Sequence, residues 1–402
     1  MAIEVTLGPP DAVRLALDTV HMAFGEISAE EDFAREDKVM PTDRILAAFD
    51  ADFAVGAAAS YPFRLTIPGG EVAAAGVTWV GVLPSHRRRG VMSAMMRAQI
   101  DDVHERGEPL AILWASESAI YGRFGYGIGA PCLALDAERG RFRLRDDPGP
   151  SGAVRLVERD EAARLFPPIY EHVRVATPGM LSRTKGWWAE YRLGDPEAWR
   201  RGAGPKFYAV LELDGAAVAY AIYRIKSNWE QGIPRGELRI AEAFATSTVG
   251  TRELWRFLFG IDLVAKVQMF ALDAASALFL MVMDGRSLQL KVADGLWLRL
   301  VDVEAALQAR SYADAEPVVL SVHDRFCPWN KGRFRVSDDS GRTRQSADVE
   351  LDVADLASAY LGAFDFHRLA DAGRARELKP RGLERASLLF RTPRPPYCPE
   401  VF

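Results

Sequence analysis

Three consecutive arginines and a glycine, Arg87 to Gly90, form the stretch of this sequence that is best suited to hold an anion. Arginine carries a fixed positive charge and forked donors that match phosphate oxygens. The β-forming run Gly76–Val82 predicts a strand before them, and Pro84 ends it because proline has no amide hydrogen. A helical pattern follows at once and Gly107 ends it. Because the first amides of a helix lack partners, this turn predicts a site for an anion such as a pyrophosphate.

The same stretch carries a family resemblance. Residues 80–90, Val-Gly-Val-Leu-Pro-Ser-His-Arg-Arg-Arg-Gly, resemble the acetyl-CoA signature of the GNAT N-acetyltransferase superfamily. Met92 stands where that signature usually has a small residue, a departure similar to what one branch, the Eis (enhanced intracellular survival) acetyltransferases, tolerates. The resemblance implies that the turn amides hold the CoA pyrophosphate and that the preceding strand pairs with the pantetheine arm. The acetyl-CoA ligands assigned in this way are Val80, Gly81, Val82, Arg87, Arg88, Arg89, Gly90, Val91 and Ser116.

A tyrosine follows the next predicted strand, Leu110–Ala115, a continuous apolar run that is typical of a buried strand. Ser116 or Ser118 can cap a short helix after it, which places Tyr121 just past the strand end, where open α/β sheets bind ligands. From the residues alone, a packed core aromatic and a catalytic hydroxyl fit Tyr121 equally well. The string Ile-Tyr-Gly-Arg-Phe-Gly-Tyr-Gly resembles the Eis branch, whose first tyrosine is the general acid. The resemblance implies that role for Tyr121 and a structural role for Tyr126.

The chain ends Pro-Tyr-Cys-Pro-Glu-Val-Phe after a stiff, proline-rich stretch. Most termini are frayed and carry no function, but an aromatic last residue can be buried. Eis-like chains end on an aromatic residue whose free carboxylate enters the N-terminal active site. The resemblance therefore implies that the α-carboxylate of Phe402 is the catalytic base. Val401 replaces the acidic residue of well-known members, and Glu400 is assigned as the acceptor contact instead.

An acidic segment with aromatic residues lies near the N-terminus, between Phe24 and Asp37. Two interpretations fit it: a solvated helix face, or one wall of an acceptor site in which carboxylates attract a polyamine and aromatic rings pack against it. The second interpretation completes the predicted substrate-binding set, which is Phe24, Glu26, Phe33, Trp79 and Glu400.

Composition limits the remaining possibilities. With 402 residues, 49% hydrophobic and 26% charged, the chain has room for two or three ordinary globular domains. No apolar run is long enough to span a bilayer and no signal-like segment begins the chain. Three widely spaced cysteines argue against a disulfide framework and a zinc site, and favour the cytoplasm. A formal net charge of −5 gives no nucleic-acid footprint and suits a cationic substrate.

The order of the predicted elements indicates an α/β and α+β protein with two similar units and a third, different one. We expect a GNAT-like domain over residues 1–147, with separate strands Phe53–Pro62 and Phe63–Ile67. A linker rich in Pro, Gly and Ser follows, and a second GNAT-like domain over 148–292 lacks the arginine turn and is predicted not to bind CoA. Residues 293–402 resemble the sterol-carrier-protein-like domain of Eis chains.

These features together predict an enzyme that transfers an acetyl group from acetyl-CoA directly to an amine, without a metal or an acyl-enzyme. The resemblance implies aminoglycosides and other polyamines as acceptors, sometimes protein lysines, and a homo-oligomer such as a hexamer. Two alternatives stay open: a protein-lysine or peptide acetyltransferase, and a non-catalytic CoA- or lipid-binding protein. An open acidic groove would favour the first of these over a deep acceptor pocket.

Overall fold

The computed structural model describes residues 3–145, 149 and 151–402, and it divides into two compact units. The first unit holds residues up to 130, 295–396 and 400–402; the second holds 131–294 and 397–399. The chain leaves the first unit within strand β6 (Gly127–Glu138) and returns within β14 (Lys291–Leu300). The segments at the two ends of the sequence therefore belong to one unit. Residues 146–148 and 150, where the sequence predicts a linker, lie outside the described residues.

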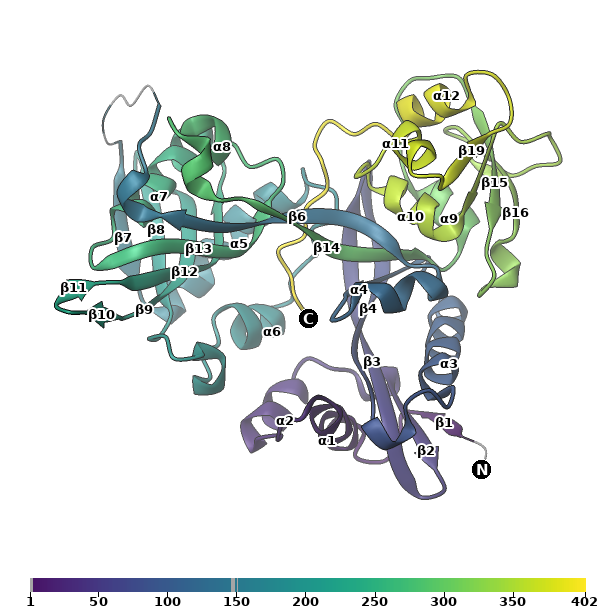
Figure 1. Ribbon diagram of the computed structural model, residues 1–402, viewed down its shortest axis with the longest axis horizontal. Helices are drawn as coiled ribbons and strands as arrows, with labels where there is room; N and C mark the ends of the chain where they lie inside the picture. The colour runs from purple at the N-terminus through teal and green to yellow at the C-terminus, as the bar shows by residue number, and fades with distance from the viewer. Residues whose placement is uncertain (1–2, 146–148, 150) are drawn as a thin grey trace. The chain divides into compact units, whose positions relative to one another are not determined.

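The N-terminal part of the first unit is a mixed sheet in the order β1, β2, β3, β4, β5 and β14 (Figure 1). Only β4 and β5 among these neighbours run parallel, and α3 connects them, as the predicted βαβ unit requires. The strands are β1 (Glu4–Leu7), β2 (Ile45–Asp50), β3 (Phe53–Ile67), β4 (Gly70–Val82) and β5 (Leu110–Trp114); the helices are α1 (Ala12–Phe24), α2 (Glu30–Glu36), α3 (Val91–Glu105) and α4 (Ser118–Tyr121).

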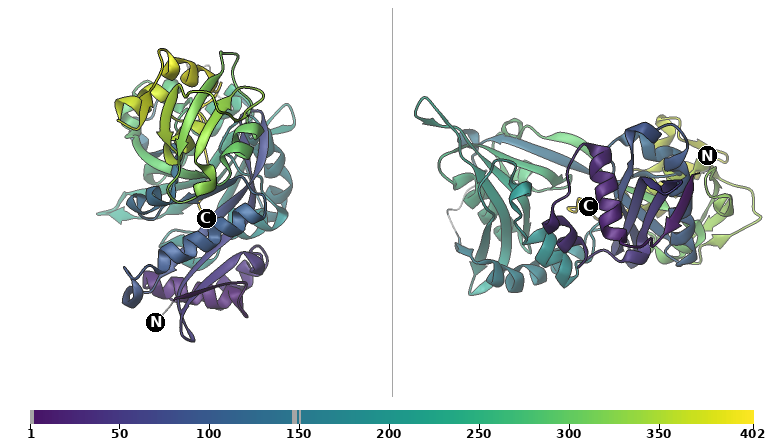
Figure 2. Two further views of the ribbon diagram at one scale, coloured as in Figure 1. Left: turned by 90° about the vertical axis from the view of Figure 1, so that its right-hand side faces the viewer. Right: turned by 90° about the horizontal axis from the view of Figure 1, so that it is seen from below.

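Helices α1 and α3 cover opposite faces of this sheet, and two glycines let them approach closely. Gly81 of β4 pairs with Ala57 of β3, so the adjacent Gly56 faces the other side of the sheet. A Cβ on Gly81 would lie 3.3 Å from Val20 of α1, and one on Gly56 would lie 3.0 Å from Met95 of α3. β4, called the signature strand here because it leads into the acetyl-CoA signature, is thus held between α1 and α3. Helix α3 begins directly after Arg87–Gly90, the arginine turn (Figures 1 and 2).

The second unit contains strands that are hydrogen-bonded in the order β6, β13, β12, β9, β8 and β7. The two faces of these strands carry separate cores, one with Phe166 and Tyr170 of α5 and the other with Leu254 and Trp255 of α7. The elements are β7 (Ala153–Val157), α5 (Arg159–Arg174), α6 (Lys185–Trp187), β8 (Phe207–Leu213), β9 (Ala216–Lys226), β10 (Trp229–Glu230), β11 (Ile233–Pro234), β12 (Gly236–Ala245), α7 (Thr248–Gly260), β13 (Val264–Asp273) and α8 (Leu278–Met281).

The helix that corresponds to α3 in the second unit is α7, and its start differs from the arginine turn. The Ser247 side chain caps α7 and accepts a hydrogen bond from the Gly250 amide at 3.0 Å. No arginine stands between β12 and α7. A side chain already occupies this helix start, and the absence of CoA binding by this unit stays a prediction.

The C-terminal domain, green to yellow in Figures 1 and 2, has a five-stranded sheet in the order β17, β16, β15, β18 and β19. β15 and β18 run parallel, and α10 follows β18 directly, capped by the Asp352 side chain as its sequence predicts. The elements are α9 (Val303–Ala309), β15 (Val318–His323), β16 (Gly332–Val336), β17 (Gly341–Arg342), β18 (Val349–Asp352), α10 (Val353–Tyr360), α11 (Phe366–Asp371), β19 (Ala375–Glu377) and α12 (Gly382–Leu389).

Three local expectations differ from the structure. β3 is one strand through Tyr61 and Pro62, because β2 ends its pairing at Ala59 and leaves an edge where proline is tolerated. α1 continues two turns beyond the predicted end at Leu17, to a left-handed Gly25. The strand assigned to the start of the third domain is part of β14, which pairs with β5 of the N-terminal sheet.

Candidate active site

The signature strand opens away from its neighbour at the point where the family resemblance places the acetyl donor. β4 and β5 pair only over Ala74–Gly76 and Leu110–Ile112 within the described residues. Beyond Gly76 the β4–β3 ladder shifts register, and Trp79 adopts a left-handed φ of 54°, the mark of a β-bulge. The side of β4 that faces β5 is therefore free of ladder partners over Trp79–Val82. Exposed strand amides of this kind can bind a carbonyl or amide of a ligand.

The arginine turn presents an uncapped helix N-terminus. Gly90 is the N-cap of α3, has a φ of 85° and lacks a capping side chain. Arg88 is also left-handed, with a φ of 62°. A Cβ on Gly90 would meet no heavy atom within 4 Å, so the space above the turn is open to a ligand. The free amides and the dipole at the start of α3, together with the open space above the turn, suit a phosphate group of an incoming substrate.

The three arginines of the turn have different surroundings. Arg87 donates to the backbone carbonyls of Val82 and Ala23, at 3.3 and 3.1 Å. Arg89 pairs with Asp50 at 3.2 Å. Arg88 is exposed and has no ion-pair or hydrogen-bond partner in the described part of the chain. Arg87 and Arg89 therefore also hold the turn in shape, and Arg88 is the arginine left to meet an anion.

The two tyrosines of the segment after β5 differ in access. Both are buried, and their ring centroids are 6.0 Å apart in an edge-on arrangement. The Tyr126 hydroxyl is fully enclosed without a hydrogen-bond partner in the described structure, whereas that of Tyr121 is not among the enclosed oxygens. Burial, with a smaller contribution from the Glu117 charge, raises the pKa of Tyr121 to about 12. Tyr121 is thus protonated at neutral pH and slightly more exposed than Tyr126, 5% against 1%.

The last residue of the chain lies beside β3 and β4 of the same unit. The Phe402 ring packs edge-on against Phe63, with centroids 5.0 Å apart, and against Tyr61 at 6.5 Å. Gly76 makes room for both phenylalanines, because a Cβ there would lie 2.4 Å from Phe63 and 3.2 Å from Phe402. Gly76 is also where β4 leaves β5. The C-terminal residue is therefore held at the fork of the two strands.

Sequence reasoning missed the residues that surround Phe402. The Tyr61 hydroxyl donates to the buried carboxylate of Glu36 at 2.8 Å, and the Tyr61 ring meets Trp79 edge-on at 6.3 Å. Glu36 also accepts from Arg35. The available signal was the pair of aromatic residues on either side of Pro62, which a predicted break at that proline concealed.

The predicted acceptor residues fall into two groups. Phe24, the last residue of α1, and Glu26 just after it are exposed. Phe33 is buried under the Arg14 guanidinium, which lies 4.0 Å from its ring centroid. Within the described structure Glu30 and Asp32 pair with arginines, and Glu26 does not. Glu400 is fully enclosed, whereas Val401 is 50% exposed, so the Glu400 side chain is out of reach of an acceptor. Ser116 is exposed just beyond the end of β5.

Comparison with known proteins agrees with this geometry. Two family models described as acetyltransferase (GNAT) domains match residues 7–129 and 179–300, and a sterol carrier protein domain model matches 303–399. The chain is therefore an N-acetyltransferase built from two GNAT domains and a sterol-carrier-type domain, and the predicted fold class is confirmed.

Relatives of the full chain define the family more narrowly. An uncharacterized N-acetyltransferase of Streptomyces avermitilis is 40% identical over all of both chains. N-acetyltransferase Eis of Mycobacterium tuberculosis is 34% identical over 88% of each chain. The crystal structure of Eis1 from Mycobacterium abscessus superposes with a TM-score of 0.85 at 32% identity, covering both chains completely. The chain belongs to the Eis family of N-acetyltransferases. No helix in the described structure is long and apolar enough to cross a membrane.

Proposed function

We propose that this N-acetyltransferase moves the acetyl group of acetyl-CoA to an amine of an aminoglycoside or another polyamine, directly within a ternary complex. GNAT acetyltransferases in general use acetyl-CoA. In this chain the Gly90 turn and Arg88 would hold the CoA pyrophosphate, and the free backbone of Trp79–Val82 would bind the pantetheine arm and the thioester carbonyl. The exposed carboxylate of Glu26 and the ring of Phe24 would attract and pack the cationic acceptor.

A group of this chain can be assigned to each chemical step of the transfer. The α-carboxylate of Phe402 accepts a proton from the acceptor ammonium, directly or through water, and frees the nitrogen lone pair. The nitrogen bonds to the acetyl carbon, while β4 amides stabilise the oxyanion. The carbon–sulfur bond breaks as Tyr121 gives its proton to the departing sulfur, and Tyr121 regains a proton from the nitrogen, directly or through water, as the nitrogen loses its extra proton to become the amide. The pKa of Tyr121 lies above that of a thiol, so this transfer fits the moment when negative charge develops on sulfur.

The observation that carries the proposal is the position of Phe402 at the fork of β4 and β5. The last residues of a chain are usually poorly ordered unless contacts tie them down. The Phe402 ring packs against Phe63 and Tyr61, and Gly76 leaves room for it. The pairing of β4 with β5 also ends at Gly76. This brings a carboxylate-bearing residue next to the stretch of backbone that suits a thioester.

The test is CoA release by the full-length protein with kanamycin, spermidine and a lysine peptide as acceptors. Removing Phe402 shifts the terminal carboxylate by one residue, and we expect kcat to fall by about 10²–10³ with every accepted amine, the range of general-base catalysis. Phe402→Tyr retains both the ring and the carboxylate and should retain most of the activity. Equal activity in the truncated and full-length proteins would contradict the assigned base.

The acceptor class is tested separately with the same panel. Glu26→Gln is expected to raise KM for kanamycin and spermidine with little change in kcat, because an exposed carboxylate contributes mainly to attraction of the cation. Turnover of the lysine peptide alone, with none of kanamycin, would favour the peptide acetyltransferase instead. The cytoplasmic location and the hexamer implied by the family resemblance stay predictions.

A further inference from the structure

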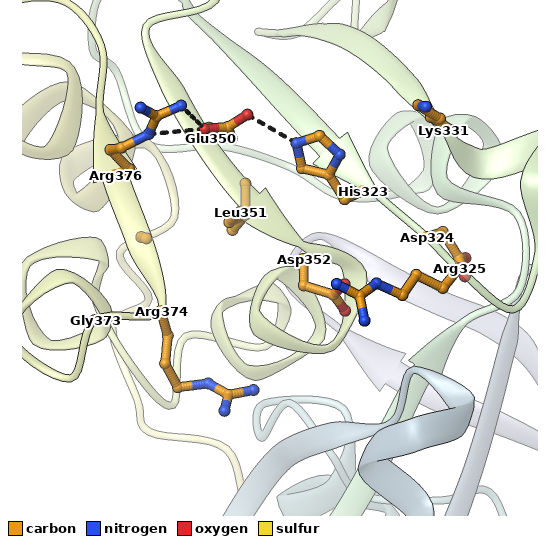
Figure 3. A pocket seen from close by; sticks show the side chains of 11 residues that line it. His323, Asp324, Arg325, Lys331, Glu350, Leu351, Asp352, Gly373, Arg374 and Arg376 are labelled. Carbon is orange, nitrogen blue, oxygen red and sulfur yellow. Dashed lines mark hydrogen bonds and ion pairs between the residues drawn. The ribbon is translucent and has the colours of Figure 1, made fainter.

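The C-terminal domain contains a cavity of about 650 Å³ that is remote in sequence from the acetyl-transfer residues. It lies where the parallel strands β15 and β18 end and is lined mainly by charged side chains (Figure 3). The residues that matter for its chemistry are His323, Arg325, Lys331, Glu350, Asp352 and Arg376.

One carboxylate of the lining is fully engaged within the protein. Glu350 of β18 accepts from His323 at 2.8 Å and pairs with Arg376 of β19, as the dashed lines in Figure 3 show. The hydrogen bonds from His323 and Arg376 hold the pKa of Glu350 below its usual value, so it stays ionised and occupied. It offers no free charge to a cationic ligand.

The other two carboxylates are engaged as well. Asp324 is buried and accepts hydrogen bonds from Arg299, the Asn330 amide group and the backbone amides of Phe326 and Cys327. Asp352 accepts from the Ala354 amide at 3.1 Å as the N-cap of α10. Asp324 and Glu350 are therefore already paired with cations of the protein, whereas Asp352 accepts one backbone hydrogen bond.

Two cations of the lining are left over. Arg325 and Lys331 are exposed, and neither has an ion-pair or hydrogen-bond partner for its side chain within the described residues. They follow β15 and precede β16, on one side of the cavity. Arg374, by contrast, pairs with Asp355 and points away from Glu350 in Figure 3. Among the described residues, the lining therefore has two positive charges without an ion-pair partner, on Arg325 and Lys331, and one negative charge, on Asp352, so the balance is positive.

The start of α10 adds nothing to this preference. The Asp352 side chain already caps it and accepts from the Ala354 amide, as Ser247 caps α7. Leu351 and Ala375 are the main apolar members of the lining. Although the domain matches a sterol carrier protein model, a cavity of this kind would strip water from several charges if it enclosed an apolar molecule.

We propose that this cavity is a binding site for a small anion with two or more negative charges, of the phosphate-ester or pyrophosphate type. Arg325 and Lys331 hold the ligand, and Arg376 shares its guanidinium between the ligand and Glu350. The site is separate from the Gly90 turn and does not depend on the acetyltransferase reaction. Because the two leading cations are exposed, binding weakens as ionic strength rises.

The test is calorimetric titration of the full-length protein with inorganic pyrophosphate in low salt, with CoA present at saturation to block the Gly90 turn. We expect one pyrophosphate bound per chain. The double variant Arg325→Gln with Lys331→Gln should weaken binding at least about ten-fold, a loss of about 1.4 kcal/mol. The matched control is Arg333→Gln with Arg344→Gln, which removes two exposed cations of the same domain outside the cavity.

Three results would overturn the proposal. The first is the absence of pyrophosphate binding to the unaltered protein with CoA present. The second is equal weakening in both double variants, which would mean that only the general surface charge matters. The third is binding of a fluorescent sterol or fatty acid that pyrophosphate fails to displace and the Arg325 and Lys331 variants leave intact. Normal thermal unfolding of both variants confirms that each comparison concerns folded protein.

Discussion

Tyr121 and Tyr126, five positions apart, allow the role of one hydroxyl to be distinguished from the role of the segment that carries both. The Tyr126 hydroxyl is enclosed without a partner in the described structure, and Tyr121 is the more exposed of the two, at 5% against 1%. We expect Tyr121→Phe to lower kcat by about 10²-fold or more with little change in KM for acetyl-CoA, because a proton donor is lost but no binding group is. Steady-state CoA release with a good amine acceptor measures both constants.

Tyr126→Phe is the matched control for that experiment. Its buried hydroxyl makes no hydrogen bond, so removing it should leave kcat within a few-fold and keep or raise the melting temperature. Similar losses in the two variants would mean that the segment, and not one hydroxyl, supports the reaction, and Tyr121 would lose its assigned role.

The pH dependence of Tyr121 can be predicted with its sign. Burial raises its pKa from 10.0 to about 12, so the folded protein holds this proton more tightly than the unfolded chain does. The contribution to stability is fully present below pH 10 and is lost as the pH rises toward 12. Unfolding by urea at pH 8–11, compared with Tyr121→Phe, should show this difference in slope. Any loss of activity below pH 10 then belongs to another group.

The glycines at the two ends of α3 provide a matched pair of substitutions that tests the anion site. Gly90 and Gly107 both have a positive φ, 85° and 71°, and a Cβ on either would meet nothing within 4 Å. Alanine at either site should therefore cost a similar strain, about 1 kcal/mol. Only Gly90→Ala should also raise KM for acetyl-CoA and reduce the rise in melting temperature that CoA produces, because only this end faces the proposed pyrophosphate. Equal KM values in the two variants would contradict the anion turn.

The same elements show what the sequence could and could not predict. The arginine turn, α3 and β5 follow from local patterns, since a proline, two glycines and an apolar period define their ends. Tyr61, Phe63 and Glu36 could not be assigned, because their importance arises from Phe402, which is more than 330 positions away in the sequence. The pairing of Gly295–Leu300 with β5 could not be predicted for a similar reason: a strand pattern does not identify its partner strand.

A buried ion cluster in the second unit holds β12 to the segment that carries α6. Glu242 accepts from Arg183 at 2.7 Å, from Arg192 at 2.6 Å and from the Tyr220 hydroxyl at 2.9 Å. Burial alone would raise the pKa of Glu242, but the two arginines outweigh it and lower the pKa to about 2. We expect Glu242→Gln to cost about 3–5 kcal/mol, because it leaves buried guanidinium charge uncompensated.

The pH dependence of that variant checks the cause. A carboxylate with a depressed pKa contributes stability above its unfolded value of 4.5, and that contribution is lost as the pH falls toward 2. The difference in unfolding free energy between the unaltered protein and Glu242→Gln should be constant above about pH 5 and shrink below it. A difference independent of pH would point to lost packing instead of lost charge.

Across the first unit, the C-terminal domain is tied to the segment after Tyr121 by a fully buried arginine. Arg299 of β14 pairs with Asp324 of the C-terminal domain, and both side chains are almost completely enclosed. A Cβ on Gly125 would lie 2.1 Å from the Arg299 guanidinium, and one on Gly127 would lie 1.9 Å from the Ala354 carbonyl of α10. Because the two glycines have no side chains, both contacts can form against the segment that follows Tyr121.

This connection predicts that stability and turnover respond differently to the pair. Arg299→Met or Asp324→Leu alone leaves buried charge or donors uncompensated and should cost about 3–5 kcal/mol. The double variant should regain only the part that comes from the unpaired charge, because Asp324 also accepts from Asn330 and from the Phe326 and Cys327 amides. The double variant still lacks the guanidinium that packs against Gly125, so its kcat should stay below that of the unaltered protein at a temperature where both are folded. Chemical unfolding and steady-state kinetics on the same four proteins measure the two effects. Full recovery of kcat together with stability would show that the pair only holds the domain in place, and the support of Tyr121 would then have to come from α10.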